Sequence, residues 1–234
     1  MKASTHFDSY AEFYDRTLDE ALQASGENHE FFARGRVSWF ARCLRRTGAQ
    51  PRHVLDYGCG IGATAPLFCE ILRAESVVGV DESLRSLEAA RREYASERAR
   101  FFSLAEYEPA GAVDLAYCNG VFHHISKDQR SNAAAYVFKS LRPGGLFAFW
   151  ENNPWNPGTR YVMARCEFDN DAVPISALEA RRLLRSAGFE VLRTDFLFIF
   201  PRFLKILRPI ERLFVRLPLG AQYQVLCRKP ASQQ

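Results

Sequence analysis

The sequence of 234 residues lacks the features of several protein classes. It has no run of about 18 apolar residues, so we expect no membrane-spanning helix. Its start shows no signal-peptide pattern, which favours a cytoplasmic protein. The six cysteines include no C-x-x-C pair, a distribution that fits neither a zinc site nor a disulfide framework. We therefore predict no bound metal, and we find no internal repeats or low-complexity tracts.

The formal net charge of +4 is unevenly distributed. Residues 201–219 carry one acid, Glu211, and their basic residues are Arg202, Lys205, Arg208, Arg212 and Arg216. The rest of the chain is balanced. A nucleic-acid-binding protein is expected to show a broad basic face with interleaved aromatics or a known reading motif, and the sequence has neither. We therefore expect no nucleic-acid partner.

Strands and helices alternate from Arg52 onward, which predicts a parallel sheet covered on both faces. We expect strands at 52–56, 76–81, 99–103, 113–118 and 145–151, and helices at 62–73, 83–96, 127–141 and 175–187. Two later runs, 190–200 and 222–228, favour an antiparallel hairpin at the sheet edge. The predicted fold is α/β and Rossmann-like, with a doubly wound, mostly parallel seven-stranded sheet.

We interpret residues 1–234 as one domain with four parts. Residues 1–48 form an N-terminal helical segment, 49–199 a cofactor-binding core, 200–220 a basic amphipathic insertion, and 221–234 the last strand and tail. In the first part, Phe7, Tyr10, Phe13 and Tyr14 share one face of a short helix, and a second helix is expected at 29–46. The aromatic face either packs on the domain surface or forms a lid whose tyrosines close over the pocket.

The insertion has apolar residues on one helical stripe and cations mostly off it, with Pro209 interrupting the helix. We interpret it as a helical cover over the sheet or the pocket. The alternative is an interfacial helix that makes weak contact with a membrane surface, which would suit a lipid-linked acceptor.

The stretch Asp56-Tyr57-Gly58-Cys59-Gly60-Ile61-Gly62 reads as a strand followed by a glycine turn that leads into a helix, an arrangement that lets a ligand lie against bare backbone. Gly58, Gly60 and Ala63 also satisfy G-x-G-x-x-A, so a nicotinamide cofactor remains an alternative. Asp56 would repel a pyrophosphate, whereas it would attract a cationic sulfonium cofactor with a free ammonium group. Asp81, about 20 residues after the glycines, is placed to reach ribose hydroxyls.

These motifs resemble the class I S-adenosylmethionine-dependent methyltransferases, of the bacterial small-molecule O-methyltransferase type. The resemblance covers Arg52 to about Asn153 and includes the 114–125 stretch after the fourth strand and the Leu141-Arg142-Pro143-Gly144-Gly145 turn. It implies S-adenosylmethionine as cofactor. The predicted cofactor-binding residues are Tyr14, Asp56, Gly58, Cys59, Gly60, Gly62, Asp81, Glu82, Ser83, Ser103, Leu104, Ala105, Asn119 and Gly120. The family's acid for the adenine amine is missing, which leaves either the Leu104 and Ala105 backbone or Glu106.

The candidate catalytic residues are His123, as a general base, and Glu151, which ends the fifth strand. A histidine packed under the sheet end is the structural alternative for His123. The loop after Glu151 is stiffened by two prolines and lies where such folds bind substrate. The predicted substrate-binding residues are Tyr10, His123, Asn153, Trp155 and Arg160.

We expect methylation of oxygen on a small polar or anionic metabolite, such as a sugar, organic acid or phosphonate. The alternative acceptor is the carbon of a quinone-like or lipid-linked molecule. From other classes, a nicotinamide-dependent oxidoreductase and a cofactor-binding protein without catalysis stay open. A monomer or homodimer is expected.

Overall fold

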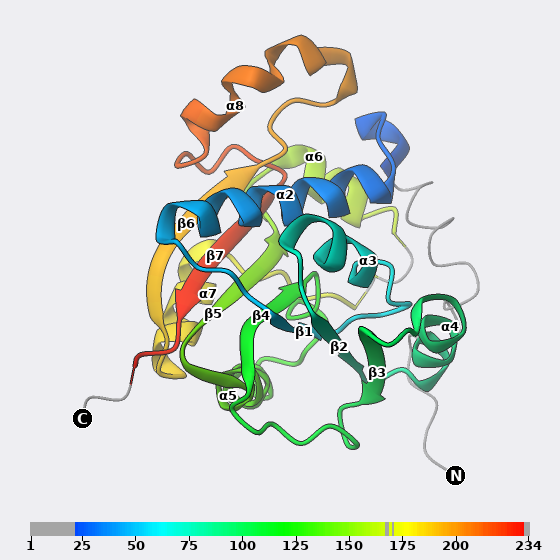
Figure 1. The fold of residues 1–234 in the computed structure, drawn as a ribbon. Helices are drawn as coiled ribbons and strands as arrows, with labels where there is room; N and C mark the ends of the chain where they lie inside the picture. Colours follow the sequence, from blue (N-terminus) through cyan, green and yellow to red (C-terminus); the bar gives the residue numbers. More distant parts are fainter. Residues whose placement is uncertain (1–21, 167–168, 170, 232–234) are drawn as a thin grey trace.

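The computed structural model describes residues 22–166, 169 and 171–231, and it contains a seven-stranded sheet in the order β3-β2-β1-β4-β5-β7-β6 (Figure 1). The strands are β1 His53–Tyr57, β2 Ser76–Asp81, β3 Ala99–Ser103, β4 Val113–Asn119, β5 Leu141–Asn152, β6 Glu190–Leu197 and β7 Gln222–Arg228. Strands β1 to β5 pair in parallel, while β7 is antiparallel to both β5 and β6. The predicted fold, including the antiparallel edge hairpin, is therefore confirmed.

Strand β5 begins four residues before the predicted 145, because Leu141 already pairs with Val113 ahead of an irregular register in that strand pair. The described helices are η2 Gln23–Ser25, α2 His29–Thr47, α3 Ala65–Leu67, η3 Phe68–Leu72, α4 Leu84–Tyr94, α5 Arg130–Ser140, α6 Pro157–Met163, α7 Ala177–Ser186, η5 Arg202–Leu207 and α8 Arg208–Phe214.

Helices cover both faces of the sheet, as in a doubly wound fold. On one face, Phe40 of α2, Phe68 of η3 and Leu87 of α4 belong to one buried cluster. On the other face, Val137 of α5 and Leu184 of α7 belong to a second cluster. Each such fully buried side chain contributes roughly 1.5–3 kcal/mol relative to exposure, so the two clusters fix the sheet beneath the site.

Helix α2 follows the prediction closely. The Asn28 side chain accepts the Phe31 backbone N–H at 3.0 Å and so caps the start, and Gly48, with φ of 69°, lies in the left-handed region just after the end. The helix also carries Arg36, a buried arginine that the sequence did not single out. The helix expected at 62–73 is shorter, at 65–72, because the glycine turn extends to Thr64.

The insertion departs from the prediction. It forms η5 and α8, and Pro209 occupies the first turn of α8 instead of interrupting a helix. Its apolar side chains face outward: Ile206 is 85% exposed, Phe203 78% and Leu213 74%. These helices do not bury side chains against the sheet, since η5 and α8 have no buried residue. The other form of the prediction, a cover over the pocket, stays a prediction. Figure 1 shows α8, in orange, beyond the end of the sheet.

The predicted N-terminal aromatic face, including Tyr10 and Tyr14, lies outside the described residues, so the lid stays a prediction. Among the described helices, none combines the length and the apolar character needed to cross a bilayer.

Candidate active site

A cavity of about 490 Å³ lies at the carboxyl ends of the central strands, where an open α/β sheet binds its ligands. The residues on its wall that the sequence predicted are Gly58, Gly60, Asp81, Glu82, Leu104, Asn119, Gly120 and His123. Residues on its wall that the sequence did not single out include Arg36, Asp169 and Gln222, and His124, the neighbour of His123, also lines it. The structure therefore brings together motifs that follow β1, β2, β3 and β4, and adds groups from α2, from β7 and from the segment after α6.

The three glycines of the turn do different work. Gly58, Gly60 and Gly62 all have positive φ, at 72°, 53° and 81°. A Cβ on Gly58 would lie 2.3 Å from Val121, and one on Gly62 would lie 2.9 Å from Ala90 and Phe101, whereas a Cβ on Gly60 would meet nothing within 4 Å. Gly58 and Gly60 both line the cavity, but of the three glycines only Gly60 has room for a Cβ. Gly62 is required by packing against Ala90 and Phe101, and its position under the cofactor stays a prediction.

This difference gives a matched pair of substitutions. Both Gly60→Ala and Gly62→Ala place a side chain at positive φ, which costs about 1 kcal/mol in each. We expect Gly62→Ala to lower the melting temperature further, because its Cβ clashes with Phe101. Gly60→Ala should instead weaken S-adenosylhomocysteine binding by about tenfold, because its methyl group enters ligand space. Calorimetric titration measures the affinity and thermal denaturation the melting temperature. Equal losses of affinity in the two variants would contradict the inference that Gly60, and not Gly62, has its open side toward the ligand.

The two acids of the cofactor motifs lie close together beneath this turn. Asp81 accepts hydrogen bonds from the backbone N–H of Gly60 at 2.8 Å and of Ser83 at 2.9 Å, and it lines the cavity beside Glu82. Asp56 is only 3% exposed. Burial, followed by repulsion from Asp81, raises the pKa of Asp56 to about 7, although Arg36 opposes the rise. A cationic ligand group near Asp56 would relieve this unfavourable burial.

Several residues predicted to bind cofactor have structural roles. Ser83 is fully buried and caps α4 by accepting the Ser86 N–H. Burial, with the nearby Asp81 and Asp56, raises the pKa of the Cys59 thiol well above its ordinary value, so Cys59 is a packed, unreactive residue. Ser103 and Ala105 are absent from the described cavity wall, where Leu104 is present.

The structure also bears on the two candidates for binding the adenine amine, the Leu104–Ala105 backbone and the Glu106 side chain. The Glu106 carboxylate accepts the Ser103 N–H at 2.8 Å and pairs with Arg91 at 3.3 Å. These bonds hold it in the turn after β3, so the backbone near Leu104 is the better placed of the two. Nearby, the Asn119 Oδ1 atom is buried without a hydrogen-bond partner in the described part of the chain, although Asn119 lines the cavity. An acceptor left in this state is suited to a ligand N–H or O–H.

His123 and Glu151 form a buried pair. Glu151 Oε2 lies 2.5 Å from His123 Nδ1, and Oε1 accepts the Phe122 backbone N–H at 2.7 Å. Burial alone would lower the pKa of His123, but attraction to Glu151 and hydrogen bonds with Asp169 and Glu151 outweigh it and raise the pKa to about 10. His123 is therefore a cation at neutral pH. It is a hydrogen-bond donor there, which does not fit the general base that the sequence suggested.

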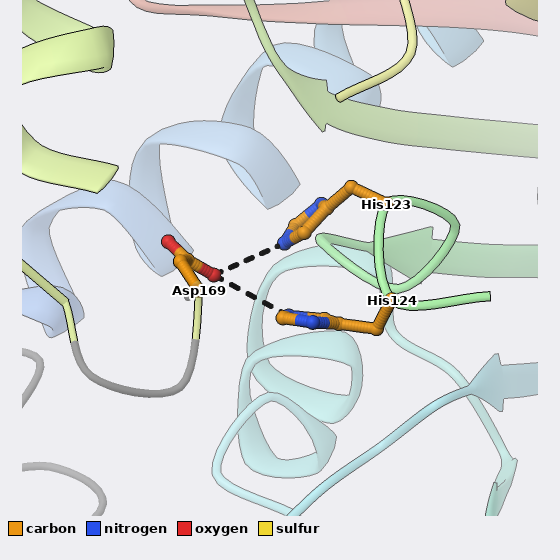
Figure 2. Close-up of side chains that lie close together, drawn as sticks. All are labelled: His123, His124 and Asp169. Carbon is orange, nitrogen blue, oxygen red and sulfur yellow. Dashed lines mark ion pairs between the residues drawn. The ribbon is translucent and has the colours of Figure 1, made fainter. Parts of the chain in front are cut away.

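Figure 2 shows His123, His124 and Asp169 converging, with Asp169 Oδ1 3.3 Å from His123 Nε2 and 3.4 Å from His124 Nε2. All three line the cavity. Their candidate ligand atoms lie within 4.8 Å of one another, so this is a place where the described residues could hold a metal ion. Asp169 comes more than 40 residues after the histidines, so no spacing pattern in the sequence could have revealed the cluster.

The predicted acceptor loop is placed differently. The Asn153 side-chain N–H groups donate to the carbonyls of Pro218 and Gly220, at 3.0 and 2.8 Å, and so hold the end of the insertion. Trp155 is 51% exposed and lines a separate surface depression, and Arg160 is exposed. The structure does not bring these three side chains into the 490 Å³ cavity, because the loop turns into α6, a helix that the sequence analysis missed.

Arg36 supplies the cation that Arg160 was expected to provide. Its Nε donates to the Tyr117 hydroxyl at 3.0 Å, and one terminal nitrogen donates to the Gln222 side chain at 3.0 Å. The guanidinium therefore faces the cavity in a fixed orientation. It was missed because its only sequence signal is a charge among the apolar residues of α2.

Residues 54–145 match the family described as "Methyltransferase domain". The chain is 30% identical over 136 residues to a trans-aconitate 2-methyltransferase of Delftia acidovorans; the match covers 56% of this chain and 50% of that relative. Among solved structures, an S-adenosylmethionine-dependent methyltransferase of Thermotoga maritima superposes with a TM-score of 0.63 at 20% identity, covering 95% of this chain and 98% of the other. A methyltransferase solved with the Trm112 activator of Haloferax volcanii gives 0.67 at 17% identity, with 98% and 100% covered.

Residues 54–145 therefore form a class I methyltransferase domain, and its methyltransferase relatives imply S-adenosylmethionine as the cofactor. The chain spans about half the length of the first of these relatives. The resemblance to class I methyltransferases inferred from the motifs is confirmed, while the O-methyltransferase type stays a prediction. This also decides between the two cofactor classes that the glycine turn left open, since the matched proteins are methyltransferases and not nicotinamide oxidoreductases.

Proposed function

We propose that the protein transfers the methyl group of S-adenosylmethionine to oxygen on a small anionic acceptor, with a carboxylate of an organic acid favoured. The observation that supports this proposal most directly is the buried cation Arg36 on the wall of the cavity that Gly60 lines. An anionic acceptor needs a cationic clamp and arrives already deprotonated.

The chemistry asks little of the protein beyond alignment. The cofactor supplies a methyl carbon bonded to a positively charged sulfur. A carboxylate oxygen forms the new C–O bond as the S–C bond breaks, its electron pair stays on sulfur, and no proton has to move. Arg36 then orients the acceptor. Because Glu151 and Asp169 hold His123 as a cation, His123 is not available as a base, and an alcohol acceptor would need another one.

The similarity to trans-aconitate 2-methyltransferase supports an organic acid, since aconitate is a carboxylic acid. The aligned part is half of that relative, so the acceptor is a proposal for this chain. We also propose a cytoplasmic monomer or homodimer. A lipid-linked or quinone-like acceptor is the second candidate, favoured by an apolar cavity that adjoins the catalytic one.

Radiolabelled methyl transfer to a panel of carboxylates, sugars and phosphonates tests the acceptor class. We expect base-labile methyl esters with carboxylates, and we expect Arg36→Gln to lower kcat/KM about 100-fold, because it removes a buried charge partner. The matched control is Arg160→Ala, an exposed arginine expected to leave kcat/KM unchanged. Equal losses of kcat/KM in Arg36→Gln and Arg160→Ala would contradict the proposal that Arg36 binds the acceptor. A parallel loss of S-adenosylhomocysteine affinity in Arg36→Gln would instead place Arg36 on the cofactor.

A further inference from the structure

A second cavity of about 380 Å³ adjoins the catalytic one. The two share part of their walls, at Leu22, Phe32, Asn152, Val162 and Gln222. From there the second cavity passes Met163 and the aromatic ring of Phe198 and reaches Phe200, Pro201 and Arg208, where the insertion begins. An apolar route therefore connects the methyl-transfer site with the base of the insertion.

The insertion itself presents apolar side chains to solvent. Those exposed include Phe203, Ile206, Ile210, Leu213, Leu217 and Leu219. Between them stand two exposed cations, Lys205 and Arg212, which have no ion pair or hydrogen bond within the described residues. Isolated exposed apolar residues are ordinary, but a contiguous group with free cations is typical of an interaction surface.

Hydrogen bonds and an ion pair attach the insertion to the rest of the protein. Glu211, the only acid of the segment, accepts the backbone N–H groups of Ile199 and Phe200. Arg208 pairs with Glu27 at 2.9 Å and stacks over Phe31, and Asn153 holds the carbonyls of Pro218 and Gly220. These bonds attach the insertion to the rest of the protein at both of its ends. The outward orientation of its apolar side chains is therefore part of the folded structure.

We propose that the insertion is an interfacial element that rests on an anionic lipid surface, and that the second cavity receives the hydrocarbon chain of an amphiphilic acceptor whose polar head enters the catalytic cavity. This inference rests on the proposed methyl transfer to an anionic group, and it takes the second candidate of the proposed function, a lipid-linked acceptor, in place of a small soluble acid. The cations favour a negatively charged leaflet, and the apolar side chains favour its hydrocarbon boundary.

A lipid surface accounts for two features at once, which a protein partner does not. A partner protein or a second copy of this chain would explain the exposed apolar side chains, but it would leave the cavity that runs from this surface to the methyl-transfer site without a purpose. A membrane supplies both the surface and the chain that fills the cavity.

Vesicle co-sedimentation of the full chain tests the surface. We expect binding to phosphatidylcholine vesicles with 30% phosphatidylglycerol, about tenfold less binding to pure phosphatidylcholine, and weakening in 0.5 M NaCl. The variant Phe203→Glu with Leu213→Glu should lose binding about tenfold, while Leu178→Glu, an exposed leucine on α7, is the matched control. No binding to anionic vesicles, or binding unchanged by the double variant, overturns the proposal, and so does self-association that the double variant abolishes.

The second cavity is tested by the fluorescence of dansyl-undecanoic acid. We expect the probe to bind and Met163→Trp, which fills the cavity, to reduce its affinity about tenfold. In every variant S-adenosylhomocysteine affinity is measured in parallel. Retained cofactor affinity with no probe binding to the unaltered chain would defeat the amphiphile and leave the methyltransferase proposal intact; loss of methyl transfer to every acceptor would defeat the latter.

Discussion

Asp56→Asn is expected to weaken S-adenosylhomocysteine binding by at least about 100-fold at pH 8, because the family resemblance makes Asp56 the carboxylate partner of the ligand's ammonium group. Asp56 is buried just behind the residues that line the cavity. The affinity of the unaltered protein should rise with pH through about 7, since burial first and Asp81 second raise the pKa of Asp56 to that value. Below it the carboxyl is neutral and attracts the ammonium group less. Calorimetric titration at pH 5.5, 7 and 8.5 measures this slope, which Asp56→Asn should flatten.

The same substitution should stabilise the empty protein. The pKa of Asp56 is higher in the folded chain, at about 7, than its ordinary 3.8, so the folded state binds the proton more tightly and loses stability as pH rises through 7. The shift corresponds to roughly 4 kcal/mol at pH 8. We expect Asp56→Asn to melt at a higher temperature than the unaltered chain at pH 8, and the two to converge near pH 4.

The control is Glu190→Gln, which removes an exposed carboxylate from the edge strand β6 and should change neither affinity nor its pH dependence. An Asp56→Asn protein that binds S-adenosylhomocysteine normally would show that this carboxylate does not hold the ammonium group. That result would also remove the electrostatic argument by which Asp56 favours a sulfonium cofactor.

Glu151→Gln is expected to lower kcat/KM about 100-fold at pH 8 without changing cofactor affinity. The substitution removes the attraction and the hydrogen bond that hold the His123 pKa near 10, so burial, which opposes the charge, gains influence and the pKa falls toward its ordinary 6.5. At pH 8 His123 would then be largely neutral, and it would lose one of the two N–H groups that fix its ring between Glu151 and Asp169 on the cavity wall. In the unaltered protein activity should persist to about pH 9 and fall as pH rises through 10.

The pKa itself is followed by NMR titration of the His123 imidazole carbon-bound protons, assigned by comparison with His123→Gln. This readout separates a positioning role for Glu151 from simple damage to the fold. The control is Glu88→Gln, an exposed acid of α4. If the His123 resonance titrates at the same pH in Glu151→Gln as in the unaltered protein, Glu151 does not set the charge of this histidine.

The cofactor half of the site could be read from the sequence because its residues lie at the ends of consecutive strands. Gly60 follows β1, while Asp81 and Asn119 are the last residues of β2 and β4, and parallel strands bring their carboxyl ends to one edge. The same reasoning also assigned cofactor binding to motif residues that have structural roles. Ser83 and Gly62 belong to the motifs, yet one caps a helix and the other fits against Phe101.

The acceptor half could not be read in this way. Arg36 comes from a helix before the sheet, Asp169 from the segment after α6 and Gln222 from the last strand, so only folding brings them to one wall. The sequence analysis assigned the loop from Asn153 to Arg160 to the acceptor because it contains many polar residues. In the structure, the Asn153 side chain instead donates hydrogen bonds to the backbone carbonyls of Pro218 and Gly220.

The sequence by itself determined the alternating fold and the glycine turn and favoured the cofactor class, because each depends on local spacing and on residues near the ends of neighbouring strands. Only the tertiary structure decided which glycine faces the ligand, which charge His123 carries and which way the insertion turns its apolar side. Each of these depends on contacts between segments far apart in the chain: Gly62 with Phe101, His123 with Glu151 and Asp169, and the insertion with Glu27 and Asn153.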